Sequence, residues 1–429
     1  MPAVRRALLV AAFDSQLKWC AQIEREFARR GFATRVVVPD IRSALSEGQI
    51  RDAGFEGVHR TAWDEIIASA MDSDVVVCGL SGPVIQLFTF TLAAREAAGE
   101  TVRPVVITGW VGIIIEKIVA GYLARAGSDL VAVNSGLDLE LFRDAAMRLS
   151  IPDDNLLLTG LPFLSARPSP LRSDPVRRVL FADQPTVPAA QAERLYLYRQ
   201  LIRYAERHPG REVLLKPRHR PGEDTFHRMK HHPEDLLREE VLPPNFRIDY
   251  TPISEVLPSV DLLLTMSSTA CLEALDSGCR VGLVLDLGVH ERYGNHVFLD
   301  SGLLRTFSEL AEDDIGTPDP QWFGGYFFDR HGSAAELIAD RAEELLESGY
   351  RPSRDVWKSA YFRSAAAAHA ELRTGRGRTR PSWTGAQRRA LRKRQRRYGS
   401  IRGALAHVVA ELMPPVVTRT LLHLLRRNG

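Results

Sequence analysis

Residues 213–222 bring several cationic side chains together directly after an apolar stretch. Lys216, Arg218, His219 and Arg220 follow a run whose composition predicts a buried strand. Open α/β sheets bind ligands at the carboxyl ends of their parallel strands. Arg and Lys suit phosphate, and His can donate a hydrogen bond or a proton to a leaving phosphate. The pattern predicts an anion site, and a solvated basic turn is the alternative.

A second junction, at residues 261–278, joins an apolar strand to a helix through three hydroxyl side chains. Ser267, Ser268 and Thr269 stand where the helix is expected to begin, and free N–H groups at a helix N-terminus favour an anion. Ordinary N-capping is the alternative, although a cap needs only one hydroxyl and Glu273 misses the capping-box position by one residue. We therefore expect phosphate binding here, with Glu273 facing a ribose hydroxyl or the base.

Two further loops are expected beside the same site. Gln184 and Thr186 follow the strand predicted at 178–182, where a plain β-turn would give the same pattern. The polar segment 288–298 follows another predicted strand and contains Asn295. We interpret this segment as a loop that contacts the bound ligand, with a solvated surface loop as the alternative.

A general base is expected in the first half of the chain. Asp14 directly follows the first predicted strand, from where a carboxylate could take a proton from an acceptor hydroxyl. Asp14 could equally cap the first helix, and Glu116 is the second candidate for the base. His219 is the candidate proton donor to the leaving phosphate.

The sequence offers no credible metal site: no Asp-x-Asp, no His-x-x-x-His and no cysteine cluster in it forms a convincing set of ligands. Lys216, Arg218 and helix dipoles are expected to neutralise the leaving group instead. We therefore expect neither a metal nor a cofactor.

Two motifs carry a family resemblance. Lys-Pro-Arg-His at 216–219 is followed about 50 residues later by Ser-Ser-Thr-Ala-x-x-Glu-Ala at 267–274. The pair resembles the C-terminal nucleotide site of GT-B glycosyltransferases. It is most similar to bacterial sialyltransferases, polysialyltransferases, Kdo transferases and the glycerophosphotransferases of teichoic acid synthesis. The sialyltransferase-like group holds its cytidine nucleotide with a His-Pro motif, whereas Arg220 separates His219 from Pro221 here. Residues 1–360 also resemble an uncharacterised actinobacterial family described as glycosyltransferases.

The resemblance implies an α/β fold of GT-B type, with two Rossmann-like domains facing a cleft. It also implies transfer of a sugar from a nucleotide-activated donor to a surface-glycan or lipid-linked acceptor. A sialic-acid-like sugar carried by CMP is one candidate donor. Two alternatives stay open. One is glycerophosphate transfer or nucleotide-sugar epimerisation on the same fold, and the other is a non-enzymatic protein that binds nucleotides or nucleic acid.

The elements that must position these residues alternate between apolar strands and helix-length segments. Such alternation predicts parallel sheets covered on both faces. The strands are predicted at 6–13, 33–39, 74–78, 103–108, 130–133, 156–159, 178–182, 212–216, 246–249, 261–265 and 280–285. We expect an acceptor domain at 1–161, a linker at 162–177, a nucleotide-sugar domain at 178–350 and a closing helix at 351–372. The predicted helix at 334–348 could pack on either domain.

Charge is distributed unevenly although the net charge is only +3. Residues 373–429 hold 15 Lys and Arg against one acidic residue, which leaves residues 1–372 at −11. Apolar residues at helical spacing follow the basic run. Such a basic, helical tail favours an anionic membrane surface over a nucleic acid as its partner.

Two further features of the sequence, its apolar runs and its cysteines, indicate the cellular compartment. The sequence contains no run of 18 apolar residues, so we expect no membrane-spanning helix. Its four dispersed cysteines are typical of a reducing compartment. We expect a cytoplasmic protein bound peripherally to the inner face of the cell membrane.

Overall fold

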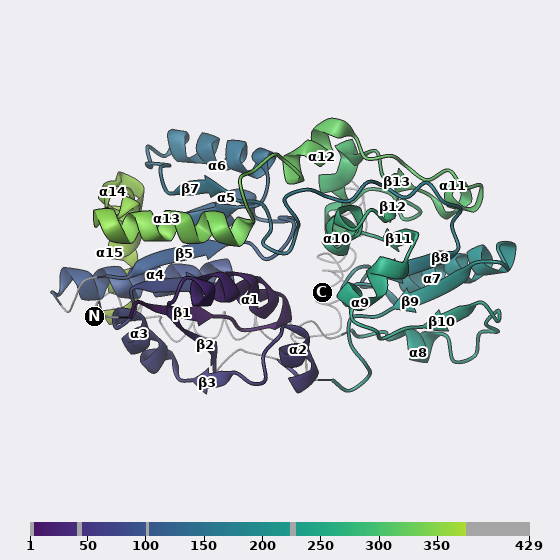
Figure 1. The fold of residues 1–429 in the computed structure, drawn as a ribbon, viewed down its shortest axis with the longest axis horizontal. Coiled ribbons are helices and arrows are strands. Elements are labelled where there is room, and N and C mark those ends of the chain that lie inside the picture. The colour runs from purple at the N-terminus through teal and green to yellow at the C-terminus, as the bar shows by residue number, and fades with distance from the viewer. Residues whose placement is uncertain (1–3, 41–44, 100–102, 224–228, 375–429) are drawn as a thin grey trace, which may run out of the picture. The chain divides into compact units, whose positions relative to one another are not determined.

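The computed structural model describes residues 4–40, 45–99, 103–223 and 229–374. The chain up to Ser364 forms one compact unit, which contains two parallel β-sheets flanked by helices (Figure 1). The predicted basic tail lies outside the described residues from residue 375 onward. The two sheets define an N-terminal and a C-terminal domain.

The N-terminal sheet has seven parallel strands in the order β3-β2-β1-β4-β5-β6-β7. They are β1 (Arg6–Val10), β2 (Ala33–Pro39), β3 (His59–Thr61), β4 (Val75–Cys78), β5 (Val105–Gly109), β6 (Leu130–Val133) and β7 (Leu156–Leu158). Neighbouring residues of a strand point to opposite faces. Leu9 therefore joins a core with helix α1 (Asp14–Arg29), and Leu8 joins another core with α4 (Gly82–Ala97). Both faces of the sheet are covered, as predicted.

The other helices of this domain connect successive strands. They are α2 (Glu47–Asp52), α3 (Trp63–Met71), α5 (Ile118–Arg125) and α6 (Gly136–Arg148). The order of the strands reverses between β1 and β4, and ligands of doubly wound folds bind at such switch points. Asp14, at the start of α1, lies directly after β1.

The C-terminal sheet has six parallel strands in the order β10-β9-β8-β11-β12-β13. They are β8 (Arg178–Ala182), β9 (Glu212–Lys216), β10 (Phe246–Ile248), β11 (Leu262–Thr265), β12 (Arg280–Val284) and β13 (Leu304–Arg305). The helices are α7 (Gln191–Arg207), α8 (Pro233–Leu236), α9 (Ile253–Val256), α10 (Ala270–Asp276), α11 (Phe307–Ala311) and α12 (Pro320–Tyr326). Short 3₁₀ turns lie at η1 (Leu257–Ser259), η2 (Glu291–Tyr293) and η3 (Asn295–Ser301). The two domains thus repeat one Rossmann-like topology.

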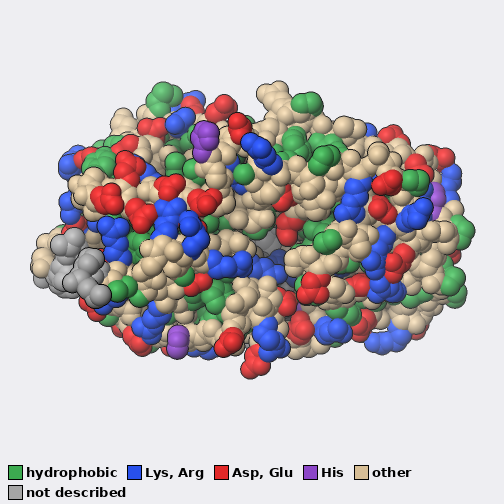
Figure 2. All heavy atoms as spheres, in the orientation of Figure 1, with side chains coloured by type: hydrophobic (Ala, Val, Ile, Leu, Met, Phe, Trp, Pro, Cys, Tyr) green, Lys and Arg blue, Asp and Glu red, His purple; other side chains and the backbone are tan. Residues whose placement is uncertain are grey.

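The surface carries interspersed charges. On the face drawn in Figure 2, hydrophobic side chains form small scattered areas between acidic and basic ones. In the part of the chain that the structure describes, no helix is both long and apolar enough to cross a bilayer.

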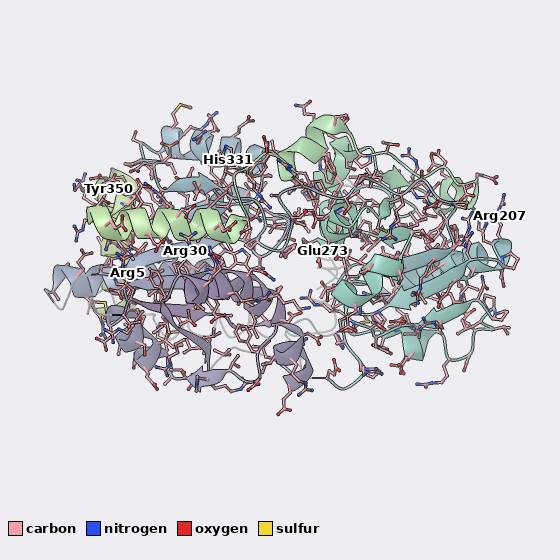
Figure 3. The ribbon with its side chains drawn as sticks, viewed as in Figure 1. Arg5, Arg30, Arg207, Glu273, His331 and Tyr350 are labelled. Carbon is pink, nitrogen blue, oxygen red and sulfur yellow. The ribbon has the colours of Figure 1, made fainter. Side chains whose placement is uncertain are left out.

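Helix α13 (Ala334–Ser348) returns to the N-terminal domain. Its residues Ile338, Ala342 and Leu345 are buried in the same core as Leu9. Arg30, at the end of α1, pairs with acidic side chains of α13 (Figure 3). The C-terminal domain therefore ends before α13 rather than at residue 350. An apolar helix face suits either sheet, so periodicity could not decide between the two domains.

The last two described helices are α14 (Pro352–Lys358) and α15 (Ala360–Thr374). The hydroxyl of Ser353 on α14 donates a hydrogen bond to Asp129, and both residues are fully buried. Asp129 also accepts a hydrogen bond from the N–H of Val106 in β5. This network attaches α14 to the N-terminal sheet.

Candidate functional site

Lys216 ends strand β9 and carries a charge that no acidic side chain neutralises by direct contact. Its side chain is partly buried and makes no ion pair or hydrogen bond within the described residues. Burial lowers the pKa of Lys216 to about 8, with Asp249 opposing and Lys18 reinforcing the shift. A buried cation without a direct counter-ion is costly, and an anionic ligand would remove that cost.

Arg218 lies two residues further along and contacts the N-terminal domain. Its Nη2 and Nε donate hydrogen bonds of 2.6 and 3.1 Å to the same oxygen, Oδ2, of Asp14. Burial pushes the pKa of Asp14 upward, but the charge and hydrogen bonds of Arg218 outweigh it and hold that pKa below its ordinary value. Asp14 is the first residue of α1, and Phe13 occupies the cap position. The structure thus joins the predicted base to a predicted phosphate ligand.

Lys18 and Glu273 complete this charged group. Lys18 lies one turn after Asp14 on α1, on the same side of the helix. Glu273 of α10, labelled in Figure 3, is partly buried. Its carboxylate has no hydrogen bond or ion pair within the described ranges. Burial raises the pKa of Glu273, while the nearby charges of Lys18 and Arg218 oppose the rise. We name Asp14, Lys18, Lys216, Arg218 and Glu273 the charged cluster.

Lys18 is the member that the sequence did not reveal. The only available signal is its spacing of four residues from Asp14, and that spacing marks a neighbour on any helix surface. Its proximity to Lys216 and Glu273 depends on how the two domains meet, which no local pattern encodes.

Gln184 and Ser267 bond to each other and brace the loops of the C-terminal domain. The N–H of Ser267 donates to Oε1 of Gln184 at 2.9 Å, and the Ser267 hydroxyl donates to the Tyr293 carbonyl at 2.5 Å. Behind them, Arg194 forms a buried ion pair with Asp183 and donates to the Gln184 carbonyl. These bonds join the loops after β8, β11 and β12. Gln184 and Ser267, both predicted to bind the ligand, therefore hold these loops together.

The two neighbouring hydroxyls differ in their surroundings. Ser268 is partly exposed, and within the described residues its hydroxyl makes one hydrogen bond, accepted at 3.3 Å from the N–H of Ala270. Thr269 accepts a hydrogen bond of 3.2 Å from the N–H of Ile113, in the loop after β5 of the other domain. A Cβ atom on Gly112 would lie only 2.6 Å from the Thr269 hydroxyl oxygen. Thr269 therefore joins the domains, and Ser268 retains hydrogen-bonding capacity for a ligand.

His219 braces the loop after β9. Its side chain is buried, Nδ1 lies 2.9 Å from the carbonyl oxygen of Arg220, and Nε2 accepts a hydrogen bond of 3.2 Å from the N–H of Met229. His232 in turn contacts the carbonyl of His219. Both ring nitrogens are occupied, so this arrangement offers none to a leaving phosphate.

The remaining predicted residues make no hydrogen bond or ion pair with the charged cluster in the described residues. Asn295 is fully buried, accepts a hydrogen bond from the N–H of His290 and donates to the carbonyl of Gly288, so it shapes the loop after β12. Thr186 and Glu116 are exposed and make no side-chain hydrogen bond within the described residues. Within those same residues, no three His, Cys, Asp or Glu side chains are grouped so as to hold a metal ion.

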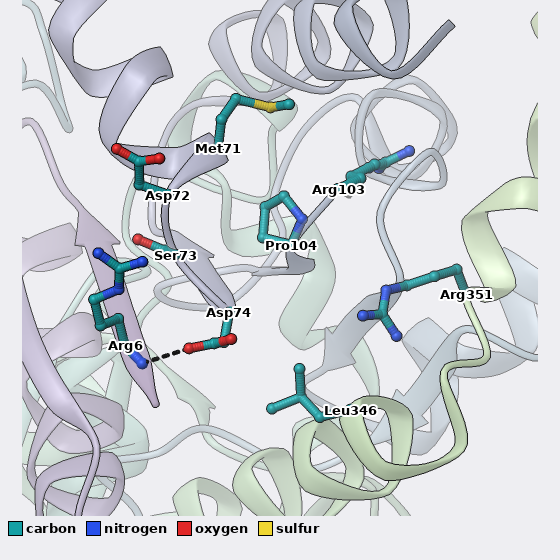
Figure 4. A pocket seen from close by; sticks show the side chains of 9 residues that line it. All are labelled: Arg6, Met71, Asp72, Ser73, Asp74, Arg103, Pro104, Leu346 and Arg351. Carbon is teal, nitrogen blue, oxygen red and sulfur yellow. Dashed lines mark hydrogen bonds between the residues drawn. The ribbon is translucent and has the colours of Figure 1, made fainter. Parts of the chain in front are cut away.

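A separate cavity of about 300 Å³ lies at the opposite, amino-terminal edge of the N-terminal sheet (Figure 4). Asp74, Arg103 and Arg351 are among its lining residues, and the backbone N–H of Arg6 donates to Asp74 beside it. Arg6 begins β1 whereas Asp14 follows that strand. The cavity is therefore distinct from the charged cluster and contains none of the predicted site residues.

Comparison with solved structures identifies the fold. A protein from Listeria monocytogenes described as a "putative UDP-N-acetylglucosamine 2-epimerase" superposes with a TM-score of 0.51 at 11% identity, covering 82% of this chain and 98% of that chain. The UDP-GlcNAc 2-epimerase of Methanocaldococcus jannaschii gives 0.50 at 10% identity, covering 80% and 100%. The calicheamicin glycosyltransferase CalG4 gives 0.43 at 15% identity, covering 88% and 100%. The first two share the fold of twin Rossmann-like domains.

Sequence comparison identifies the family. No curated protein sequence matches the chain significantly. A family profile described as "Putative glycosyltransferase (DUF6716)" matches residues 7–345, which include both sheets and every member of the charged cluster. The chain, with its two Rossmann-like domains of GT-B type, belongs to this glycosyltransferase family.

Proposed function

We propose that the protein transfers a sugar from a nucleotide-activated donor to an acceptor hydroxyl, with the donor phosphate held by the charged cluster. The observation that carries the proposal is Lys216, a partly buried ammonium at the carboxyl edge of β9 without a direct counter-ion in the described residues. Lys18 and Arg218 add positive charge beside it. A phosphate placed there would receive charge-assisted hydrogen bonds from Lys and Arg.

Roles for the other members follow from their chemistry. The carboxylate of Glu273 has no direct partner within the described residues and suits the hydroxyl donors of a ribose. The Ser268 hydroxyl can donate to a phosphate oxygen. Asp14 would accept the proton of the acceptor hydroxyl while the acceptor oxygen bonds to the anomeric carbon. The bond from that carbon to the phosphate oxygen breaks, and its electron pair leaves with the nucleotide, whose charge Lys216 and Lys18 stabilise.

We also propose the chemical classes of the donor and the acceptor. The motifs at 216–219 and 267–274 resemble those of cytidine-nucleotide enzymes, which supports a CMP- or CDP-linked donor, including a sialic-acid-like sugar. The two epimerases of similar fold, both named for a UDP-linked sugar, make UDP donors and epimerisation the second candidates. The basic segment 373–429 supports an acceptor at an anionic membrane surface, such as a lipid-linked or cell-surface glycan. A cytoplasmic protein, bound peripherally to the membrane and independent of metal, fits these proposals.

Mass spectrometry of reactions with CMP-, CDP- and UDP-linked sugars tests the proposal. Transfer or slow donor hydrolysis releases free nucleotide, whereas epimerisation alters the sugar while the nucleotide is still attached. We expect free nucleotide from one donor class, and a loss of about 10²-fold in Asp14→Asn, which keeps its size but cannot accept the proton. Epimerised donor without release, or no reaction with any donor class, would contradict glycosyl transfer.

A further inference from the structure

The ion pair between Asp14 and Arg218 joins two groups that the proposed reaction needs apart. Nε and Nη2 of Arg218 both donate to Oδ2 of Asp14. The Asp14 side chain is 12% exposed and that of Arg218 is 35% exposed. The pairing occupies an oxygen of the proposed base and directs the guanidinium toward a carboxylate instead of a phosphate.

The pair also weakens Asp14 as a proton acceptor. Burial raises the pKa of Asp14, whereas the charge and hydrogen bonds of Arg218 lower it, followed by a smaller effect of Lys18. A base is most effective when its pKa lies near the working pH. Without Arg218, only the smaller effects of the Ser15 backbone hydrogen bond and Lys18 would oppose burial, so the pKa would rise and the carboxylate would become a stronger base.

A bound phosphate would supply Arg218 with another partner. Lys216 lies two residues before Arg218, and Lys18 lies one turn after Asp14. The charges of the two lysines act on each other, and neither makes an ion pair in the described part of the chain. A phosphate attracted by both lysines would come within reach of Arg218, whose planar guanidinium binds phosphate in a bidentate manner.

We propose that the donor phosphate competes with Asp14 for Arg218, so that donor binding frees the Asp14 carboxylate to accept the acceptor's proton. The inference rests on the proposed function and adds the order in which donor binding and proton transfer occur. Without donor, Asp14 stays paired and the acceptor hydroxyl keeps its proton. Once the nucleotide leaves, Arg218 returns to Asp14. Arg218 is thus a positioning residue for the base as well as a phosphate ligand.

The test is calorimetric titration with CMP, CDP and UDP at pH 7, without any acceptor. Breaking the pair should cost the wild-type protein binding energy, so Asp14→Asn should bind nucleotide about tenfold more tightly, equivalent to about 1.4 kcal/mol. Arg218→Gln should bind about tenfold more weakly. In the Arg218→Gln background, Asp14→Asn should change affinity by less than about threefold, because the pair is already absent.

Asp52→Asn is the matched control. Asp52 is an exposed carboxylate whose charge also acts on Lys216, but it makes no bond to Arg218 in the structure. Equal tightening by Asp14→Asn and Asp52→Asn, or by Asp14→Asn in both backgrounds, would overturn the competition while leaving the nucleotide site in place. Unchanged or weaker binding by Asp14→Asn would overturn it too.

If the wild-type protein bound none of the three nucleotides, the proposed function would fail together with the inference. Thermal melting verifies folding, and Asp14→Ser replaces Asp14→Asn if the latter melts early.

Discussion

Burial brings the pKa of Lys216 close to neutral pH. An ordinary lysine keeps its proton throughout the neutral range, but burial lowers the pKa of Lys216 to about 8. A phosphate bound beside it would favour the ammonium form again. The residue therefore links ligand binding to pH.

Nucleotide affinity is predicted to fall as pH rises above about 8, by up to about tenfold per pH unit, because the free ammonium of Lys216 is lost. Stability should change in the opposite direction. Between about 8 and 10.5 the unfolded chain binds more protons at this position than the folded chain, so the contribution of Lys216 to the unfolding free energy rises with pH. Titration with CDP between pH 7 and 9.5 measures the affinity. Lys216→Arg is the control, since arginine stays charged, and an equal decline in that variant would exclude Lys216 as the cause.

Glu273 should contribute to nucleotide binding without contributing to the fold. Glu273→Gln is predicted to weaken CDP or UDP binding by about 10- to 100-fold, the usual range for a lost hydrogen bond to a charged group. Its melting temperature should hold or rise, because the partly buried carboxylate has no direct partner in the described residues. Glu206→Gln, an exposed change on α7, is the control. Wild-type affinity in Glu273→Gln would remove the ribose role.

At the scale of the elements, sequence periodicity located most strands and the helix at 334–348. The bounds of β2, β6, β8 and α13 agree with those predicted, because buried strands and amphipathic helices leave strong patterns. Strands β3 and β13 were missed, since three and two residues at a sheet edge are too few to show alternation.

The site was partly predictable for a related reason. Carboxyl ends of parallel strands converge, so Lys216 and Arg218 could be assigned to one region with Glu273. The direction in which a loop side chain turns is not encoded locally. His219 and Asn295 therefore read as ligands in the sequence but bond within their own loops in the structure.

The loop after β5 connects the domains through one close approach. Gly112→Ala would place a Cβ atom 2.6 Å from the Thr269 hydroxyl oxygen and disturb its bond to Ile113. We predict a destabilisation of about 1–3 kcal/mol, measured by chemical denaturation. Gly136→Ala, with no atom within 4 Å of the new Cβ, should be nearly neutral. The cost should shrink in a Thr269→Ala background; an equal cost there would show that the contact is not its source.

At the scale of the whole molecule, the chain crosses between the domains twice. The linker leads into β8, and α13 returns to the N-terminal core beside α1. Any shortened protein must therefore retain α13 and α14 to keep the N-terminal domain. Every strand of both sheets lies before residue 306, so a chain ending at residue 374 retains both sheets.

Membrane affinity is predicted to reside in the basic segment 373–429. Residues 1–372 carry −11 and should be repelled by anionic lipid, whereas 373–429 carry +14. The full-length protein should cosediment with phosphatidylserine vesicles, less so as salt rises, because the attraction is screened within about 8 Å at physiological ionic strength. A chain ending at residue 374 should stay in the supernatant and retain nucleotide binding. Binding of nucleic acid through this segment, without vesicle binding, would contradict the membrane assignment.

The most direct test of the whole account is a crystal structure of the protein with CDP or UDP bound. The account predicts phosphate oxygens within hydrogen-bond distance of Lys216, the Arg218 guanidinium withdrawn from Asp14, and the ribose beside Glu273. A nucleotide bound elsewhere, for example in the arginine-lined cavity at the amino edge of the N-terminal sheet, with the Asp14 to Arg218 pair still intact, would contradict it.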